Sequence, residues 1–307
     1  MAPLATRVCR VDGAYHGPYA FIPMPELPDL LYIKGELERE LVGRRVTSAR
    51  LVSPVLLRAL VEGGLGLLVG ARLERIERVA HFLLFSLSGQ RPMELAVNPM
   101  LAGRFRVATV GDKDEGSLGF ALGFEATELR YLDDRQMGKV YLLDEGNRAT
   151  IPALPLGGLY ILGPDFTLDV FAKLIAARRD QVRVFLMDKS AIDALGNAYA
   201  DEVLFAACLH PKTPCRKLSF DDVARLHNAL VTVMRAAVAE VARRKAPTEE
   251  KIRDFLQVRL RTLCPRCGHK VRKAGVHGQD SYFCPHCQPL DKPLGQPSIV
   301  DWRKTGK

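Results

Sequence analysis

The sequence predicts an α+β protein with a β-rich first half, a helical second half and a small metal-binding module. Between residues 45 and 150, short segments alternate apolar and polar or are continuously apolar, with turn formers between them. After Gly157-Gly158 the apolar spacing becomes helical, and two Cys-x-x-Cys pairs follow near the end. Strands grouped before helices are typical of an α+β fold with separate domains.

The β-rich half contains eight candidate strands in an antiparallel β-sandwich or barrel. An amphipathic helix, Leu30–Leu41, precedes them and ends at Gly43. The predicted strands are Val46–Val52, Ala71–Val79, Phe82–Leu87, Leu95–Val97, Arg104–Val107, Gly119–Phe124, Leu129–Leu132 and Lys139–Leu143.

The second half reads as helices with identifiable caps. Thr167 and Ser219 are good N-cap residues, and Gly196-Asn197 predicts a tight turn before a helix. A turn that exposes backbone N–H groups at a helix start suits phosphate binding, although a plain helical hairpin has the same pattern. The predicted helices are Thr167–Ile175, Tyr199–Leu209, Phe220–Arg244 and one that begins at Thr248.

Composition limits the class of protein. The 307 residues carry a net charge of +9, and 48% of them are apolar, which indicates a folded protein with a polyanionic partner such as nucleic acid. We find neither a secretory signal nor an apolar stretch of membrane-spanning length, so we expect a cytoplasmic protein without a membrane partner. Seven cysteines, three of them outside the paired motifs, fit a reducing compartment.

Pro25 and Glu26, in Met24-Pro25-Glu26, offer a reactive pair. If the chain began at Pro25, its secondary amine would attack a sugar C1′ to give an iminium while the carboxyl group moved protons. We therefore expect residues 1–23 to be a leader from a mis-assigned start. The plainer interpretation is a Pro-rich turn before a helix.

Two apolar loops and the cysteines complete the candidate sites. Asn98–Arg104 and Asp133–Gly138 place bulky apolar residues beside an arginine, as a base-stack wedge would, or as ordinary packing would. Four cysteines with sixteen residues between the pairs predict one structural zinc ion. They are Cys264, Cys267, Cys284 and Cys287.

Together these segments resemble the formamidopyrimidine-DNA glycosylase and endonuclease VIII family of base-excision repair enzymes. The resemblance rests on Met-Pro-Glu-Leu-Pro-Asp at 24–29, Leu-Arg-Tyr-Leu-Asp-Asp-Arg-Gln-Met-Gly at 129–138, Leu-Gly-Asn-Ala-Tyr-Ala-Asp-Glu at 195–202, and Ser-Tyr-Phe-Cys-Pro-His-Cys-Gln at 281–288. It implies a β-sandwich domain at 24–152, a helix-two-turn-helix domain at 153–258, a zinc finger at 259–290 and a tail at 291–307.

The resemblance also implies roles for particular residues. Pro25 is the expected nucleophile and Glu26 its proton-transfer partner, with strand cleavage by β- and δ-elimination after base flipping. The other candidates contact DNA as wedges, void fillers or phosphate ligands. They are His81, Met100, Leu101, Arg135, Met137, Arg183, Asn197 and Gln279.

Several positions depart from the family pattern. His81 replaces a lysine, Gln279 replaces the finger arginine, Arg183 replaces a second lysine and Met137 replaces phenylalanine. The leading hypothesis is a monomeric, nucleoid-associated glycosylase and abasic-site lyase for oxidised or ring-opened bases in duplex DNA. The alternatives are a weak or inactive member that binds damaged DNA and a zinc-ribbon RNA-binding protein.

Overall fold

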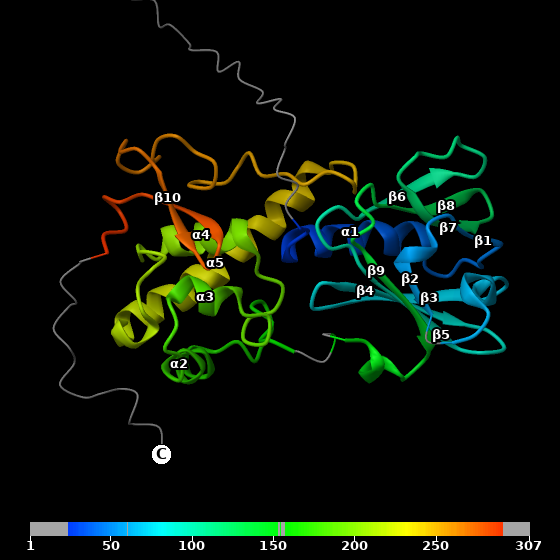
Figure 1. The fold of residues 1–307 in the computed structure, drawn as a ribbon, viewed down its shortest axis with the longest axis horizontal. Helices are drawn as coiled ribbons and strands as arrows, with labels where there is room; N and C mark the ends of the chain where they lie inside the picture. Colours follow the sequence, from blue (N-terminus) through cyan, green and yellow to red (C-terminus); the bar gives the residue numbers. More distant parts are fainter. Residues whose placement is uncertain (1–23, 60, 153, 155–156, 291–307) are drawn as a thin grey trace, which may run out of the picture.

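The computed structural model describes residues 24–59, 61–152, 154 and 157–290, so the predicted leader and tail lie outside it. Figure 1 shows a β-rich half beside a helical half, with helix α1 (Leu27–Leu41) between them and the finger strands β10 (Arg272–Val276) and β11 (Gln279–Phe283) beyond the helices. This arrangement confirms the predicted α+β fold class. None of the helices within these ranges combines the length and apolarity needed to span a bilayer.

Two sheets form the β-rich half, which is a sandwich. One has the order β1-β7-β8-β6 and is antiparallel, and the other has the order β2-β9-β5-β4-β3. All eight predicted strands are present, and the sequence missed only the short β2, which pairs parallel to β9. The strands are β1 Ser48–Leu51, β2 Leu57–Ala59, β3 Arg72–Val79, β4 Phe82–Ser88, β5 Met93–Asn98, β6 Arg104–Thr109, β7 Leu118–Phe124, β8 Thr127–Leu132 and β9 Lys139–Asp144.

Aromatic side chains fill the space between the sheets. Phe105 lies 6.1 Å from Phe85 and 5.3 Å from Tyr131 between ring centroids, and Phe120 stacks on Tyr131. Strand β4 is buried along nearly its whole length because its other face, including Phe82, packs against a second cluster outside the sandwich. Burial on both faces explains why this strand shows no alternation.

Helix α1 belongs to both hydrophobic cores. Leu27 packs in the helical core, whereas Leu30, Ile33 and Leu37 pack in the sandwich core. The helix begins three residues earlier than predicted, because the backbone N–H of Glu26 donates to the side chain of the third helical residue at 2.8 Å, as in a capping box. This double burial fixes the start of α1 at the boundary between the two halves.

The helical half contains α2 (Leu168–Ala176), α3 (Val182–Met187), α4 (Asn197–Ala206) and α5 (Phe220–Arg244). Thr167 and Ser219 accept backbone N–H groups at 3.3 and 3.1 Å, which confirms both predicted N-caps. The sequence missed α3, and α4 starts at Asn197 instead of Tyr199. Short 3-10 helices occur at Pro54–Leu56, Gly64–Leu68, Arg148–Thr150 and Cys215–Lys217.

The predicted helix at Thr248 is wrong. Residues 246–262 form an irregular linker that contacts the edge of the sandwich and then runs over the helical half to the finger (Figure 1). The Thr248 hydroxyl donates to the carbonyl of Phe105 at 2.6 Å, which ties this residue to the sandwich. Arg253 in the same linker forms an ion pair with Asp29 of α1 at 2.5 Å. Tertiary contacts therefore hold this segment in place of helical hydrogen bonds.

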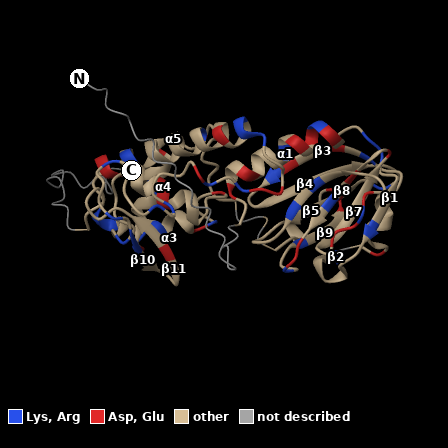
Figure 2. Cartoon of the chain, turned by 90° about the horizontal axis from the view of Figure 1, so that it is seen from above, with Lys and Arg blue, Asp and Glu red and all other residues tan. Residues whose placement is uncertain are grey.

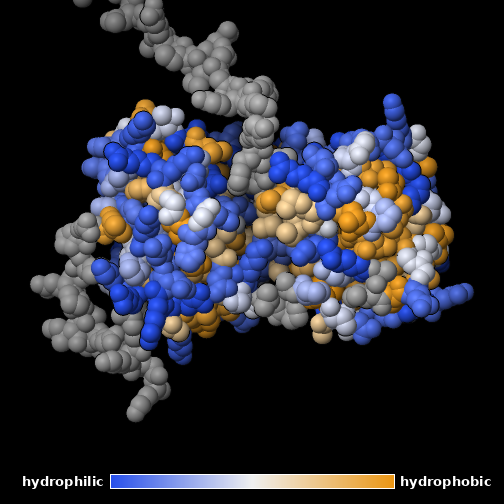
Figure 3. All heavy atoms as spheres, viewed as in Figure 1, coloured by the Kyte–Doolittle hydropathy of each residue, from blue (hydrophilic) through white to orange (hydrophobic). Residues whose placement is uncertain are grey.

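Charge and hydropathy are distributed unevenly. Lys and Arg residues are found in both halves, including the region of the finger strands (Figure 2). On the face drawn in Figure 3, hydrophilic residues cover most of the helical half, while hydrophobic residues are more frequent over the β-rich half. The exposed apolar side chains of the β-rich half include Val52, Val55 and Val69.

Candidate functional site

Glu26 lies where α1 meets the N-terminus of α4. Its carboxylate accepts backbone N–H groups from Gly196 and Ala198 at 3.0 Å each and from Tyr199 at 3.2 Å. A Cβ atom on Gly196 would lie 2.3 Å from the Glu26 carboxyl carbon, so this approach requires glycine. The contact joins positions 170 residues apart and places a carboxylate at the positive end of a helix dipole.

Opposing effects act on the Glu26 carboxyl group. Its burial raises the pKa above 4.5, while the charge of Arg253 and the hydrogen bond from Ala198 oppose the rise. Arg253 is held by Asp29, to which it donates two hydrogen bonds at 2.5 and 2.9 Å. A carboxyl group with a raised pKa keeps its proton at higher pH, which suits a proton-transfer role.

A cavity of about 480 Å³ opens in front of Glu26. It lies between the two halves and brings together five of the predicted site residues, namely Glu26, Leu101, Arg183, Asn197 and Gln279. Met24 also lines it, and the buried Pro25 lies between Met24 and Glu26 in the chain. Residues that are distant in the sequence thus share one cavity at the domain boundary.

Arg183 and Asn197 belong to a network that connects the cavity to the finger. The Arg183 guanidinium donates to the side-chain oxygen of Asn197 at 2.7 Å and to the carboxylate of Asp201 at 3.3 Å. Asp201 is fully buried and also accepts the hydroxyl of Ser281 at 2.7 Å and the N–H of Tyr282 at 3.1 Å. The finger strand β11 is thereby fixed against α4 beside the cavity.

Two predicted DNA-contact loops lie at the edge of the sandwich. Met100 has a positive φ of 50°, and its N–H donates to the Asn98 side chain at 3.0 Å, so the Asn98–Arg104 loop turns sharply. Lys251 of the linker donates to the carbonyl of Leu101 at 3.2 Å. In the second loop, Arg135 and Met137 are exposed. Neither of these two residues, nor Met100, lines the cavity.

His81, which the family resemblance places at a phosphate-contacting lysine, is buried. It is 3% exposed in the turn between β3 and β4. Burial and the positive charges of Lys189 and Arg78 lower its pKa to about 3. His81 is therefore neutral near pH 7 and does not line the cavity.

The four predicted cysteines form the expected metal site. Their Sγ atoms all lie within 4.8 Å of one another, with individual separations of 3.5 to 3.8 Å. Tetrahedral zinc with bonds near 2.3 Å separates its sulfur ligands by about 3.8 Å. Four cysteines leave no open position, so the ion is structural. Gln288 anchors the site by accepting the N–H of Cys284 and donating to the carbonyl of Leu209.

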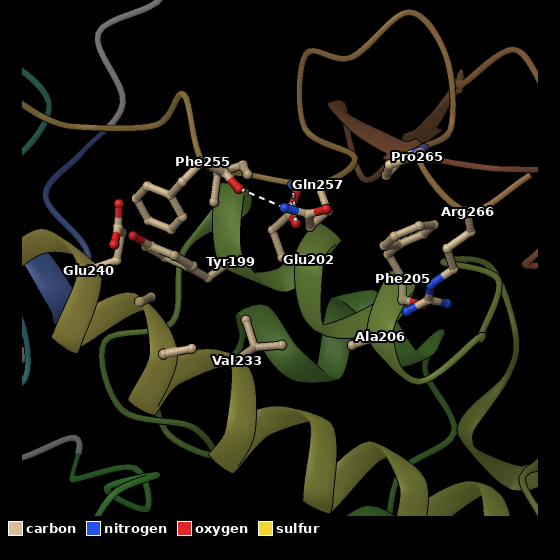
Figure 4. Close-up of a pocket in the computed structure, with 13 residues that line it drawn as sticks. Tyr199, Glu202, Phe205, Ala206, Val233, Glu240, Phe255, Gln257, Pro265 and Arg266 are labelled. Carbon is tan, nitrogen blue, oxygen red and sulfur yellow. Dashed lines mark hydrogen bonds between the residues drawn. The ribbon is translucent and has the colours of Figure 1, made fainter. Parts of the chain in front are cut away.

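A second cavity of about 480 Å³ lies on α4, between α5, the linker and the start of the finger. Figure 4 shows Tyr199 and Phe255 at one end and Phe205 with Arg266 at the other. The Glu202 carboxylate in its wall accepts the N–H groups of Gln257, Val258 and Arg259 at 2.7 to 2.9 Å. This cavity contains none of the predicted site residues, and its polar contacts hold the linker.

Several residues of the site had no signal in the sequence. Arg253, Asp201 and Lys189 became candidates only through contacts that the fold creates. Arg253, for example, meets Asp29 across 224 positions. Local patterns marked only the Met24–Glu26 segment, the Asn98–Arg104 loop and the Gly196-Asn197 turn in this region.

Three family models match consecutive parts of the chain. The N-terminal domain of formamidopyrimidine-DNA glycosylase matches residues 24–140, and the helix-two-turn-helix domain of the same protein matches residues 158–246. A zinc finger found in formamidopyrimidine-DNA glycosylase and isoleucyl-tRNA synthetase matches residues 263–290. The three matches cover the sandwich, the helical half and the finger in order.

Full-length relatives and solved structures agree with these matches. Formamidopyrimidine-DNA glycosylases of Exiguobacterium sibiricum and Symbiobacterium thermophilum are each 32% identical over 277 residues, which cover 87% of this chain and 99% and 90% of theirs. The Lactococcus lactis enzyme, solved with DNA that contains an abasic site, matches with a TM-score of 0.78 at 26% identity. That match covers 86% of this chain and 99% of the other. The chain belongs to the formamidopyrimidine-DNA glycosylase family of base-excision repair enzymes.

Proposed function

We propose that this glycosylase removes oxidised or ring-opened bases from duplex DNA and cleaves the strand at the resulting abasic site. The observation that carries the proposal is the position of Glu26, buried on the N-terminus of α4 and facing a cavity between the two halves. Solved relatives with abasic-site DNA and with a ring-opened guanine derivative support the choice of substrate.

Pro25 is the proposed nucleophile. Its nitrogen must be a free secondary amine, which requires a chain whose first residue is Pro25. The amine bonds to C1′ as the bond from C1′ to the base breaks, and the sugar ring opens to an iminium. Glu26 transfers a proton to the ring oxygen as the C1′–O4′ bond breaks.

Strand cleavage follows from the iminium. The positive nitrogen acidifies the 2′ hydrogen, and loss of that proton expels the 3′ phosphate by β-elimination. A second elimination releases the 5′ phosphate. Water then hydrolyses the iminium and frees Pro25, while Glu26 is placed to exchange protons during these steps. The zinc ion takes no part in this chemistry.

The remaining predicted residues are proposed to contact the DNA. Leu101, Met100 and the exposed loop with Arg135 and Met137 are proposed to enter the duplex and fill the space left by the flipped nucleotide. Arg183, Asn197 and Gln279 are proposed to face the phosphates from the cavity. We also propose that the protein acts as a monomer on the bacterial nucleoid, with domain boundaries at residues 24–152, 153–258 and 259–290.

One observation favours a second candidate, a protein that binds damaged DNA with little turnover. His81 is neutral and buried, and Gln279 has no charge, so two expected cations are missing near the lesion. Loss of two phosphate contacts would weaken transition-state binding by several kcal/mol, at roughly 1.5 to 3 kcal/mol for each charged hydrogen bond.

A lesion panel distinguishes the two candidates. Protein that begins at Pro25 is incubated in excess over duplexes carrying an oxidised purine, a ring-opened purine or no lesion. We expect incision of at least one lesion duplex in a single turnover and none of the undamaged duplex. Pro25→Gly should bind the same duplexes without incision. Tight lesion binding without product by the unaltered protein would favour the second candidate.

A further inference from the structure

His81 cannot supply positive charge to DNA. The side chain is 3% exposed, and its Nε2 has no hydrogen-bond partner within the part of the chain that the structure describes. Two neighbouring cations, Lys189 and Arg78, act on it together with burial and keep the ring neutral. If a phosphate is bound beside the damaged nucleotide, another group must provide the charge.

Among the basic side chains that line the cavity, Lys189 is the one without an anionic partner in the described residues. Arg183 donates to Asp201 at 3.3 Å, and Arg178 forms an ion pair with Asp188 at 2.8 Å. Lys189 follows α3 in an exposed loop, and its side chain has no ion pair or hydrogen bond in that same part of the chain. Its charge is therefore free to meet a ligand.

A second lysine approaches from the other half of the molecule. Lys139 is the first residue of β9, directly after the loop with Met137, and its backbone pairs with Asn98. Within the described ranges it has no ion pair either. Partial desolvation and, to a smaller extent, the positive charge of Lys139 lower the pKa of Lys189, so the two like charges repel one another. Asn98, its pairing partner, lies three residues before Leu101, which shares the cavity wall with Lys189. The two lysines therefore approach one cavity from different halves, and neither has an anionic partner among the described residues, which leaves a place for an anion.

We propose that Lys189 and Lys139 together bind a DNA phosphate at the damaged nucleotide and supply the positive charge that His81 does not. The inference rests on the proposed function, because it places the phosphate beside the cavity that contains Glu26. A phosphate between the two ammonium groups relieves their repulsion and accepts charge-assisted hydrogen bonds from both. Because the lysines come from different halves, the same phosphate also bridges the two domains.

The test measures binding without catalysis. Zinc-loaded protein is titrated against a duplex that contains a tetrahydrofuran abasic analogue, which lacks the C1′ hydroxyl needed for iminium formation. Fluorescence anisotropy gives Kd at several salt concentrations for Lys189→Gln, Lys139→Gln and the double variant. Lys113→Gln is the matched control. This lysine is also exposed, but it follows the last residue of β6, whereas Leu101 precedes the first. Lys189→Arg tests whether charge alone is sufficient.

We expect Lys189→Gln and Lys139→Gln each to weaken binding by roughly tenfold. Each should also reduce the slope of log K against log salt by about 1, the value for one lost phosphate contact. Lys113→Gln should change neither quantity. The double variant should lose less than the product of the single effects, because both lysines bind one phosphate. Lys189→Arg should retain most of the affinity.

The outcomes separate this inference from the proposed function. If the unaltered protein prefers the abasic duplex and Lys189→Gln matches Lys113→Gln in affinity and salt slope, the two-lysine site is wrong and the proposed function stands. If the unaltered protein shows no preference for the abasic duplex, the proposed function fails and the inference fails with it. Circular dichroism of each variant checks that the fold is retained.

Discussion

Helix α4 carries a buried glutamate contact on each of two sides, and the two contacts differ in what surrounds them. Glu26 accepts the N–H groups of residues 196, 198 and 199 at the start of the helix. Glu202, within the helix, accepts those of residues 257, 258 and 259 in the linker. Burial raises the pKa of both carboxyl groups.

The surroundings separate a reactive group from a structural one. Glu26 faces a cavity between two domains that also contains Asn197, Arg183 and the unpaired Lys189. Glu202 lies in the wall of a mostly apolar cavity and fixes the linker to α4 (Figure 4). A perturbed carboxyl group alone therefore does not identify a catalytic residue, and a cavity with basic side chains beside the group is the more specific sign.

The largest expected difference comes from making the same change at both glutamates. Glu26→Gln removes the proton-transfer group, so single-turnover incision should fall by about 10²- to 10⁴-fold. Affinity for the tetrahydrofuran duplex should change by a few-fold at most. Glu202→Gln, the matched variant, should keep the incision rate of the bound complex. Equal rate losses in the two variants would contradict the distinction between the two sites.

Removal of a zinc ligand tests the finger side of α4. Cys284→Ser should unfold the finger, because structural zinc contributes about 10 to 16 kcal/mol of binding free energy to such modules. DNA affinity should fall by roughly 100-fold, as several contacts of about 1 kcal/mol or more are lost together, while the sandwich stays folded by circular dichroism. Cys208→Ser is the control outside the metal site. Unchanged affinity would exclude the finger from the DNA surface.

Glu202→Gln should have a smaller and purely structural effect. Its amide nitrogen would face a backbone N–H, which leaves one buried donor unpaired. We expect the free energy of unfolding to fall by about 3 kcal/mol, measured by urea denaturation. If the variant released zinc more readily but kept the same free energy of unfolding, Glu202 would stabilise only the linker. No loss of either kind would contradict its assignment as an anchor.

The smallest expected effect is a pH dependence that comes from His81. Unfolded histidine binds a proton below pH 6.5, whereas folded His81 stays neutral down to a pKa of about 3. The unfolded state therefore binds more protons in this window, and stability falls as pH falls. Between pH 6.5 and 5 the loss is about 2 kcal/mol, at 1.36 kcal/mol for each pH unit.

The control for this prediction is His81→Gln, which cannot titrate. Subtracting its unfolding free energy from that of the unaltered protein at pH 7, 6 and 5 cancels the contribution of the carboxyl groups, which both variants share. The difference should shift by about 2 kcal/mol over this range. A difference that is constant with pH would show that His81 is protonated in the folded protein.

Local patterns predicted much of the fold. Alternating or continuously apolar segments located eight strands, Ser219 and Thr167 marked two helix starts, and the cysteine spacing located the zinc site. These signals depend on neighbours within a few residues, so one sequence is sufficient to read them. The Thr248 helix failed for the converse reason: its hydroxyl bonds to Phe105, 143 positions earlier, and no local pattern records that contact.

The residues of the candidate site also divide into those that a local motif predicts and those that only the fold reveals. Pro25, Glu26 and Asn197 lie in recognisable motifs, so the family resemblance identified them. Lys189 lies outside the quoted motifs, and its importance depends on the neutral state of His81, which only burial reveals. A residue such as Lys189, whose proposed role depends on the burial of another side chain, leaves no local motif.

The most direct test of the central claim is borohydride trapping on an abasic duplex. Protein whose first residue is Pro25 should form a covalent adduct, and peptide mapping should place the DNA on Pro25. Pro25→Gly should lose the proline-linked adduct, and protein that retains residues 1–24 should form none. An adduct of full yield on the form that retains Met1 would contradict the proline mechanism.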